Sequence, residues 1–239
     1  MIFFLIPVYN EDLNIFELAG SLKSSGMKAK YVFVDDGSTD NTVAEIKKSF
    51  EGFDFFIIQN KINCGPGFSF NEGFEWILKN NSSPDDLVIT LEGDNTSDLS
   101  IIPEMIKLAE SGHDLVLASV YMKGGSISEY NTLKVFLSGI ANRLTRIVFS
   151  LEVKTLTSFY RVYKVNLLKK IKAEYGTLIN EKGFICKVEL LLKAKKCDAK
   201  IIEFPTVLQS HLRKGKTKMK IVKTGLNYLL FILKNFYKY

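Results

Sequence analysis

The chain of 239 residues is 46% hydrophobic, 24% charged and 12% aromatic. This length and composition exclude a disordered, fibrous or disulfide-stapled chain and fit one domain, or one domain with a short appendage. The net charge of +6 conceals two unlike halves: residues 1–119 hold 8 Lys/Arg and 19 Asp/Glu (net −11), whereas residues 120–239 hold 24 and 7 (net +17). We therefore expect the two halves to bind different kinds of chemical group.

The cysteines and the apolar segments indicate the compartment. Cys64, Cys186 and Cys197 are far apart and in no CxxC spacing, which predicts neither a disulfide framework nor a zinc site and favours a reducing cytoplasm. The apolar N-terminus lacks a basic region and is predicted to be a strand, not a signal peptide. The uncharged stretch 224–233 is far shorter than the roughly 20 apolar residues that span a bilayer, so we expect no transmembrane helix.

Short apolar runs alternate with helix-like segments through the first half of the chain. Predicted strands cover residues 2–8, 30–34, 55–58 and 87–91. Predicted helices cover residues 13–24, 39–50 and 66–79. This alternation predicts an α/β fold with a mostly parallel central sheet flanked by helices, and ligands bound at the carboxyl ends of the strands.

The second half is less regular. Predicted strands cover residues 113–120, 156–163 and 200–204, and predicted helices cover 132–149 and 183–196. A basic loop, RKGKTKMK from Arg213, precedes an amphipathic helix that runs to the end. We divide the chain into a domain of residues 1–212, with halves 1–119 and 120–212, and an appended loop and helix of residues 213–239.

Carboxylates follow two of the predicted strands. Asp35 and Asp36 come directly after the second strand, where a carboxylate can accept hydrogen bonds from a nucleobase N–H or a ribose hydroxyl. Glu92 and Asp94 come just after the fourth strand, and their i, i+2 spacing lets both address one hard divalent cation that keeps open positions for phosphate oxygens. A capped turn with solvated acids is the alternative interpretation of the first motif, and an acid-x-acid triplet such as the second is by itself a weak signal.

Polar motifs in fact follow four successive strands: PVYNE from Pro7, VDDGSTDNT from Val34, NCGPGFSFNEG from Asn63 and LEGDN from Leu91. With these motifs the chain resembles the family 2 glycosyltransferases of the GT-A fold, a Rossmann-like architecture, and most closely their polyprenyl-phosphate branch, the dolichol-phosphate mannose synthase-like enzymes. The resemblance runs from Ile2 to about Met219.

The resemblance implies a nucleotide-sugar site in the first half. The residues expected to hold the nucleoside are Pro7, Tyr9, Glu11 and Asp36. Glu92 and Asp94 match the metal-binding DxD of the family, for Mg²⁺ or Mn²⁺ beside the donor diphosphate, with Glu92 where Asp is usual. Gly65 and Gly67 match a family loop that carries no chemistry, and an ordinary helix start explains them equally well.

The resemblance continues through YMKGG, KVFLS, LTSFYRVY and RKGKTKM. It implies that Lys134, Ser138 and Arg161 serve catalysis with Asp94 at the acceptor phosphate, and that Arg213 and Lys218 help to hold the donor nucleotide. The sequence also departs from the family at four positions. Val120 and Lys134 stand where Arg is common, Phe159 stands where Gly is common, and Thr155 stands where Asp is common. These departures leave the donor site intact and leave the identity of the acceptor open.

The type of acceptor decides whether a base is needed. A polyprenyl phosphate is already anionic, whereas a sugar hydroxyl must lose its proton to a positioned carboxylate. Relatives that use hydroxyls place an Asp early in a late helix, but LINEKGF offers only Glu181 there. We therefore predict an inverting, metal-dependent enzyme that moves a hexose from a GDP- or UDP-linked sugar to a polyprenyl phosphate.

Two other functions remain open. One is transfer to a glycan hydroxyl in surface polysaccharide synthesis, and the other is an inert nucleotide-sugar-binding or scaffold protein. No GxGxxG follows the first strand, which disfavours a dehydrogenase. No recognised module supports nucleic-acid binding.

The C-terminal segment carries aromatic residues, among them Tyr228 and Phe231, mixed with lysines. This composition predicts a peripheral location on an anionic membrane surface, at its cytoplasmic face. The alternatives are a helix that packs on the domain, on a second copy of the chain, or on a membrane-protein partner.

Overall fold

The structure is a computed structural model that describes residues 1–80, 82–127, 139, 142–215 and 221–235. Strands and helices alternate in the first half as the sequence predicts. They are β1 (Ile2–Val8), α1 (Asp12–Ser24), β2 (Lys30–Asp35), α2 (Thr42–Ser49), β3 (Asp54–Gln59), α3 (Pro66–Lys79) and β4 (Leu87–Thr90).

The later elements are η1 (Leu99–Ile101), α4 (Ile102–Glu110), β5 (Leu115–Ser119), β6 (Ser126–Ile127), β7 (Arg161–Lys164), α6 (Val165–Tyr175), α7 (Cys186–Lys196), β8 (Ile201–Pro205), β9 (Val207–Leu208), η2 (Ser210–Leu212) and α8 (Ile221–Asn235). Residues 142–148 are also helical. The predicted helix 132–149 is therefore confirmed over 142–148, and most of its earlier part lies outside the described residues.

The central sheet has seven strands in the order β3-β2-β1-β4-β7-β5-β8. All pairs are parallel except those of β7, which lies antiparallel between β4 and β5. The predicted mostly parallel α/β sheet is confirmed. Short β6 and β9 form a separate parallel pair.

One prediction about local structure is wrong, and two helices were missed. Residues 156–160 do not extend β7, because this segment curls around the Arg161 side chain, which donates to the carbonyl oxygens of Leu156 and Ser158. Helices α4 and α6 were not predicted. Their apolar periodicity is present in the sequence, and Pro103 in the first turn of α4 and Gly176 after α6 (φ +73°) mark their ends.

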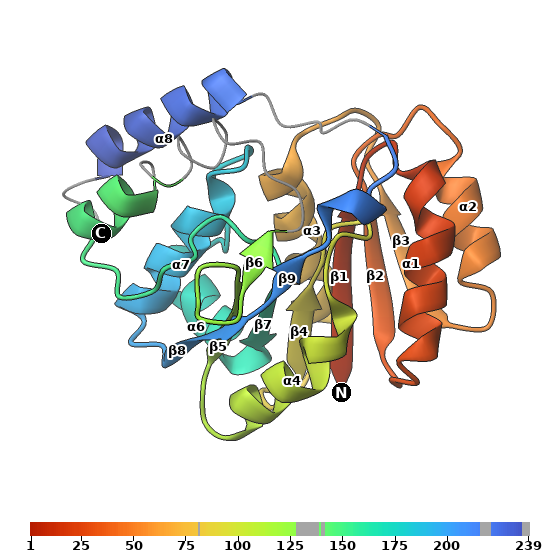
Figure 1. Cartoon of the computed structure of the whole chain (residues 1–239), viewed down its shortest axis with the longest axis horizontal. Helices are drawn as coiled ribbons and strands as arrows, with labels where there is room; N and C mark the ends of the chain where they lie inside the picture. Colours follow the sequence, from red (N-terminus) through yellow and green to blue (C-terminus); the bar gives the residue numbers. More distant parts are fainter. Residues whose placement is uncertain (81, 128–138, 140–141, 216–220, 236–239) are drawn as a thin grey trace.

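The sheet separates two hydrophobic cores. Phe3 and Leu5 of β1 pack with α3, α6, α7 and α8, whereas Phe4 and Ile6 pack on the other face with α1, α2 and α4. This alternation follows from the period of two along a strand, and burial on both faces explains why β1 is apolar throughout. Figure 1 shows α1 and α2 at one end of the molecule and α6, α7 and α8 at the other.

At Gly65 and Gly67 the backbone of the acidic half packs directly against the backbone of the basic half. Gly65 has a φ of +94°, and a Cβ at Gly67 would lie 1.8 Å from the carbonyl oxygen of Glu181. The Gly67 N–H donates to the Lys182 carbonyl (2.8 Å). Glycine is required here because α3 begins in direct backbone contact with the segment that precedes α7.

Contacts between residues cross both of the predicted boundaries, the one after residue 119 and the one after residue 212. Strand β7 connects β4 to β5 across the boundary at residue 119. Arg213 and Lys214, the first residues of the predicted appendage, bond to Asp94 and Asn14 of the first half. The residues that begin the basic loop are therefore part of the site at the sheet edge.

Candidate functional site

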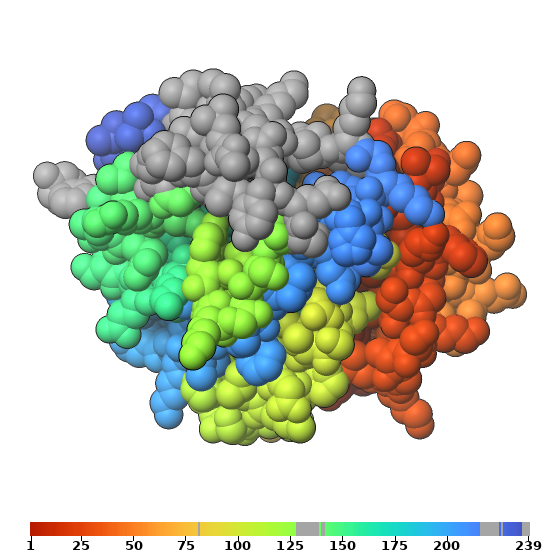
Figure 2. All heavy atoms as spheres, viewed as in Figure 1, coloured from red at the N-terminus to blue at the C-terminus, as the bar shows by residue number. Residues whose placement is uncertain are grey.

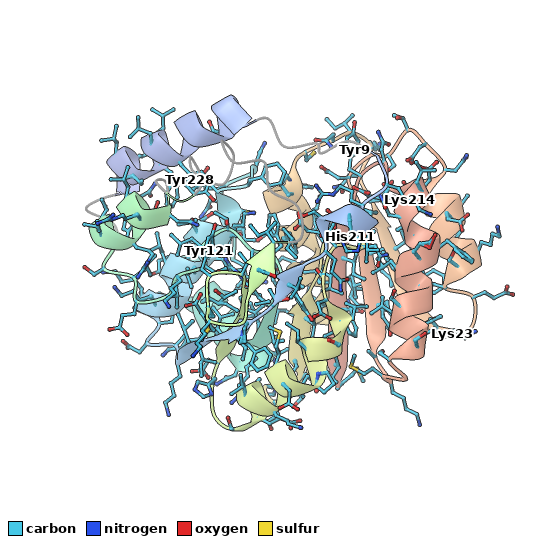
Figure 3. The ribbon with its side chains drawn as sticks, viewed as in Figure 1. Tyr9, Lys23, Tyr121, His211, Lys214 and Tyr228 are labelled. Carbon is cyan, nitrogen blue, oxygen red and sulfur yellow. The ribbon has the colours of Figure 1, made fainter. Side chains whose placement is uncertain are left out.

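The loops that follow β1 and β2 are held together by hydrogen bonds. The Asn10 N–H donates to Ser38 Oγ (2.9 Å), and the Asn10 side-chain oxygen accepts from the Thr39 N–H (2.8 Å). The structure thereby brings the predicted nucleoside residues to one edge of the sheet: Pro7, Tyr9, Glu11 and Asp36. Figure 3 shows Tyr9 at this edge, above β1 and α1.

Asp36 is 4% exposed, and its carboxylate accepts three hydrogen bonds from the loop after β3. The donors are Asn60 Nδ2 (3.2 Å), the Cys64 N–H (2.9 Å) and the Gly65 N–H (2.8 Å). These bonds fix the end of β2 against the start of α3. Asp36 thus shapes the wall of the site, and its contact with a nucleoside stays a prediction.

Glu92 and Asp94, just after β4, have different surroundings. Asp94 is 5% exposed, and one of its oxygens accepts from the Thr96 N–H (3.2 Å) and hydroxyl (2.8 Å). The other oxygen accepts from the guanidinium of Arg213. Glu92 is half-buried, and its carboxylate makes no hydrogen bond or ion pair with the described part of the chain.

This pair of carboxylates fits a divalent cation that shares its coordination with a substrate. The described residues contain no group of three or more His, Cys, Asp and Glu side chains arranged to enclose a metal ion. Mg²⁺ commonly binds through one or two carboxylates and completes its octahedron with phosphate oxygens and water. Glu92, whose oxygens make no hydrogen bond with the described residues, and Asp94, already in contact with a cationic group, are of the type that can supply such ligands, and their binding of a metal stays a prediction.

A segment after β9 crosses the carboxyl ends of β1 and β4. The Gln209 N–H donates to the Thr96 carbonyl (2.9 Å), and Arg213 then reaches Asp94. Figure 2 shows this segment, in blue, on the surface beside the red N-terminal elements and the yellow residues after β4. The structure therefore brings Arg213, predicted to contact the nucleotide, to the predicted metal ligand.

Asn14 holds this segment in place, and the sequence did not single it out. Its Nδ2 donates to the Lys214 carbonyl (3.0 Å), and its side-chain oxygen accepts from the Lys214 N–H (2.8 Å). Asn14 is 2% exposed on the buried face of α1. A polar residue at an apolar position of the helical pattern was the available signal, because such a residue must find partners when it is buried.

The Arg161 side chain is buried and bonded within the protein interior. It is 1% exposed, and its guanidinium donates to the carbonyl oxygens of Leu156, Ser158 and Lys187 at 2.9–3.0 Å and to the Tyr163 hydroxyl at 3.2 Å. These bonds join β7 to the first turn of α7. The placement argues against the predicted catalytic role, because the donors are directed to the protein interior.

Three predicted site residues lie outside the described residues: Lys134, Ser138 and Lys218. The segment that contains Glu181 is described, and Glu189 of α7 holds it. The Glu189 carboxylate accepts from the N–H groups of Asn180 (2.9 Å) and Glu181 (2.8 Å).

Helix α8 packs on the basic half. Tyr228 is 5% exposed, and the ring of Phe231 lies 6.3 Å from that of Phe149, which follows the helical residues 142–148. Burial raises the pKa of the Tyr228 hydroxyl and that of the Cys186 thiol, the latter to about 12. Figure 3 shows Tyr228 and Tyr121 on the opposite side of the view from Tyr9 and Lys214.

The strand-end loops, the carboxylate pair and the overlying cationic segment define a nucleotide-dependent transferase of the α/β class. Residues 3–172 match the family described as Glycosyl transferase family 2, and the chain belongs to that family. It is a glycosyltransferase with a GT-A fold, as the motifs predicted.

Two curated relatives are similar over most of their length. The polyprenol monophosphomannose synthase of Mycolicibacterium smegmatis is 24% identical over 84% of this chain and 74% of its own length. The undecaprenyl-phosphate mannosyltransferase of Micrococcus luteus is 24% identical over 90% of this chain and 86% of its own.

Solved structures support the fold. The glucosyl-3-phosphoglycerate synthase of Mycobacterium tuberculosis, crystallised with Mn²⁺, UDP and phosphoglyceric acid, has a TM-score of 0.69 at 15% identity. The match covers 99% of this chain and 78% of that one.

Proposed function

We propose that this glycosyltransferase moves a hexose from a GDP- or UDP-linked sugar to a polyprenyl phosphate with inversion at the anomeric carbon. The observation that carries the proposal is the Glu92–Asp94 pair at the end of β4, beside the strand-end loops and under the Arg213 segment. The two curated relatives, a polyprenol monophosphomannose synthase and an undecaprenyl-phosphate mannosyltransferase, suggest the acceptor class.

In the donor site, each group has a separate task. Pro7, Tyr9, Glu11 and Asp36 form the wall against which the nucleoside binds. Glu92 and Asp94 would hold Mg²⁺ or Mn²⁺, which when bound neutralises charge on the donor diphosphate. Arg213, together with Lys218, binds diphosphate oxygens, and Arg213 is held within reach by the Asn14 clamp on Lys214.

The chemistry needs no proton transfer. An oxygen of the acceptor phosphate forms a bond to C1 of the sugar as the bond from C1 to the donor diphosphate breaks, and the nucleoside diphosphate leaves with the bonding electrons. The protein orients the two phosphates and stabilises the charge that grows on the leaving group. A sugar hydroxyl would require a base, for which Glu181 is the candidate in the described region.

An incubation of the purified chain with GDP- and UDP-sugars, Mg²⁺ or Mn²⁺, and a polyprenyl phosphate tests the proposal. We expect a lipid-linked sugar phosphate that is resolved by mass spectrometry and lost when EDTA removes the metal. If the chain transfers the sugar only to glycan hydroxyls, the acceptor is a glycan and not a polyprenyl phosphate. Neither binding nor transfer with any donor would favour the scaffold alternative.

A peripheral membrane location fits this acceptor. None of the described helices is both long and apolar enough to cross a membrane. Helix α8 and the adjacent residues 142–148 nevertheless expose five large apolar side chains at 50–68% of their surface: Leu144, Ile147, Leu229, Leu230 and Leu233. Arg143 and Lys234 are exposed on the same helices. Apolar side chains with basic neighbours suit the interface of an anionic bilayer, at its cytoplasmic face.

Flotation with vesicles that contain anionic lipid tests this location. We expect the chain to float with such vesicles and the double variant Leu229→Ser/Leu233→Ser to lose most of that binding. Leu13→Ser, at an exposed leucine of α1, is the matched control. Equal flotation of all three proteins would contradict the assignment, and self-association of the unaltered chain without vesicles would favour a homo-oligomer.

A further inference from the structure

Lys187 lies in the first turn of α7 and is only 8% exposed. It lines a small cavity together with Thr90 of β4 and Phe159. Thr90 is the last residue of β4, so the cavity adjoins the start of the loop that carries Glu92 and Asp94. The sequence did not single out Lys187, because a lysine in a helix is ordinarily solvated.

The ammonium group of Lys187 has aromatic neighbours and no carboxylate within ion-pair distance among the described residues. Its Nζ is 4.0 Å from the ring centroid of Phe159 and 5.4 Å from that of Phe184. It makes no hydrogen bond or ion pair with the described residues. Cation–π contacts offset part of the lost hydration, but they do not replace oxygen ligands.

Lys193, two turns later on the same helix, shows how a structural buried lysine is satisfied here. Its fully buried ammonium group lies 2.8 Å from a Glu189 oxygen. It also donates to the carbonyl oxygens of Thr177 (3.1 Å) and Leu178 (3.0 Å). The same helix therefore carries one buried lysine with three oxygen partners and one with none among the described residues.

The charge near Lys187 points to the donor site. Burial lowers the pKa of Lys187 to about 8, and the negative charge of Glu92 is the main influence that opposes the decrease. A divalent cation on Glu92 would take up that negative charge, and the ammonium would then need another anion.

We propose that Lys187 is a phosphate-binding residue of this glycosyltransferase, whose ammonium group contacts a phosphate oxygen of a substrate beside Glu92. This assignment rests on the proposed function, since both substrates of that reaction bring phosphate to the site. Phosphate is the anion that fits, because it supplies oxygens both to a cation on Glu92 and to the ammonium group. In this role Lys187 acts by charge alone.

The test compares Lys187→Met and Lys187→Arg with the unaltered chain. Methionine fills a similar volume between the two rings without charge, and arginine keeps the charge. Lys196→Met, at an exposed position of the same helix, makes the same change in net charge and is the matched control. Binding of GDP and UDP with Mg²⁺ reports on the donor phosphates, and binding of a short-chain isoprenyl phosphate reports on the acceptor phosphate, both by calorimetry.

We expect Lys187→Met to weaken one of these two affinities by about tenfold or more, which corresponds to one charge-assisted hydrogen bond. Lys187→Arg should recover part of the loss and Lys196→Met should show none. The melting temperature of Lys187→Met should equal or exceed that of the unaltered chain, since an unpaired buried charge has been removed.

The affected probe identifies which substrate phosphate Lys187 binds. Unchanged affinities for both probes in Lys187→Met would overturn the proposal, as would a lower melting temperature with intact binding, which would make Lys187 a structural partner of Glu92. If the unaltered chain binds neither probe, the proposed function fails, and that result differs from the failure of Lys187 alone.

Discussion

The acidic half and the basic half carry opposite charges, yet each satisfies most of its buried charged groups internally. Asp36 in the first half accepts three hydrogen bonds from the loop after β3, and Arg161 in the second half donates to carbonyl oxygens and a hydroxyl. Glu92 and Lys187 differ, because neither makes a hydrogen bond or ion pair with the described part of the chain. The net charge of a half therefore does not locate the substrates, and we propose that they bind at these two groups, where the halves meet.

The largest effect is expected at the carboxylate pair. Asp94→Asn keeps the shape of the side chain and removes the charge that binds both a cation and Arg213. We expect transfer in Mg²⁺ or Mn²⁺ to fall by at least about 100-fold, because charge on the leaving diphosphate is no longer balanced. The matched control is Asp98→Asn, four residues later in the chain. Asp98 is the N-cap of η1 and asparagine can also cap a helix, so the transfer rate of this variant should stay within about twofold of that of the unaltered chain. Full activity of Asp94→Asn would remove the metal assignment.

A variant of Arg161 tests whether the basic half uses this buried cation for structure. Arg161→Met leaves the carbonyl oxygens of Leu156, Ser158 and Lys187 without a donor. We expect the free energy of unfolding in urea to fall by roughly 3 kcal/mol or more. Arg143→Met, at an exposed position, should change it by less than about 0.5 kcal/mol. An inactive Arg161→Met protein with unchanged stability would restore the catalytic role.

A smaller effect is expected where the basic segment meets the acidic half. Asn14→Leu removes the two hydrogen bonds that hold the Lys214 backbone and so loosens the placement of Arg213. It also removes the hydrogen bond from Asn14 Nδ2 to the Glu11 carboxylate (2.7 Å), at the predicted nucleoside wall. We expect the affinity for GDP or UDP with Mg²⁺ to fall by about five- to tenfold in calorimetry. Lys214→Met should leave it unchanged, because among the described residues the Lys214 side chain pairs with Glu17 on the surface. Equal losses in both variants would show that charge, and not placement, decides binding.

The smallest effect concerns the cysteines. Cys64 in the acidic half is partly exposed, whereas Cys186 and Cys197 in the basic half are buried, which raises the pKa of both thiols, that of Cys186 to about 12. A raised pKa leaves little thiolate at pH 8, so an aromatic disulfide reagent should titrate Cys64 rapidly in the folded chain and all three thiols only in denaturant. Rapid reaction of a buried thiol would show that α7 is more open than described.

Local patterns predicted the acidic half well. Apolar runs bounded by polar strand ends identify β1 to β4 within a few residues, because each strand is buried on both faces. The order of polar motifs was enough to place Glu92 and Asp94 at the sheet edge. The sequence could not show that Asp36 binds backbone N–H groups, since those bonds depend on how the loop after β3 folds back.

The basic half was harder to predict because its key contacts join distant segments. Arg161 fitted a catalytic motif, but its partners are the turn before it and α7, which no local pattern connects. Lys187 looks like a surface residue in the sequence, and only the packing of α7 buries it, whereas Asn14 stands at an apolar position of its helix but its partners in the segment after β9 are 200 residues away. Lys134, Ser138 and Lys218 lie outside the described residues, so their roles stay predictions.

The central claim is that the acceptor brings its own negative charge and needs no base from the protein. It is tested most directly by offering the same short-chain polyprenol with and without its phosphate, under identical conditions with the nucleotide sugar that the chain uses and Mg²⁺. The account predicts glycosylated product from the polyprenyl phosphate and none from the alcohol. Comparable product from the alcohol, abolished by Glu181→Gln, would contradict it.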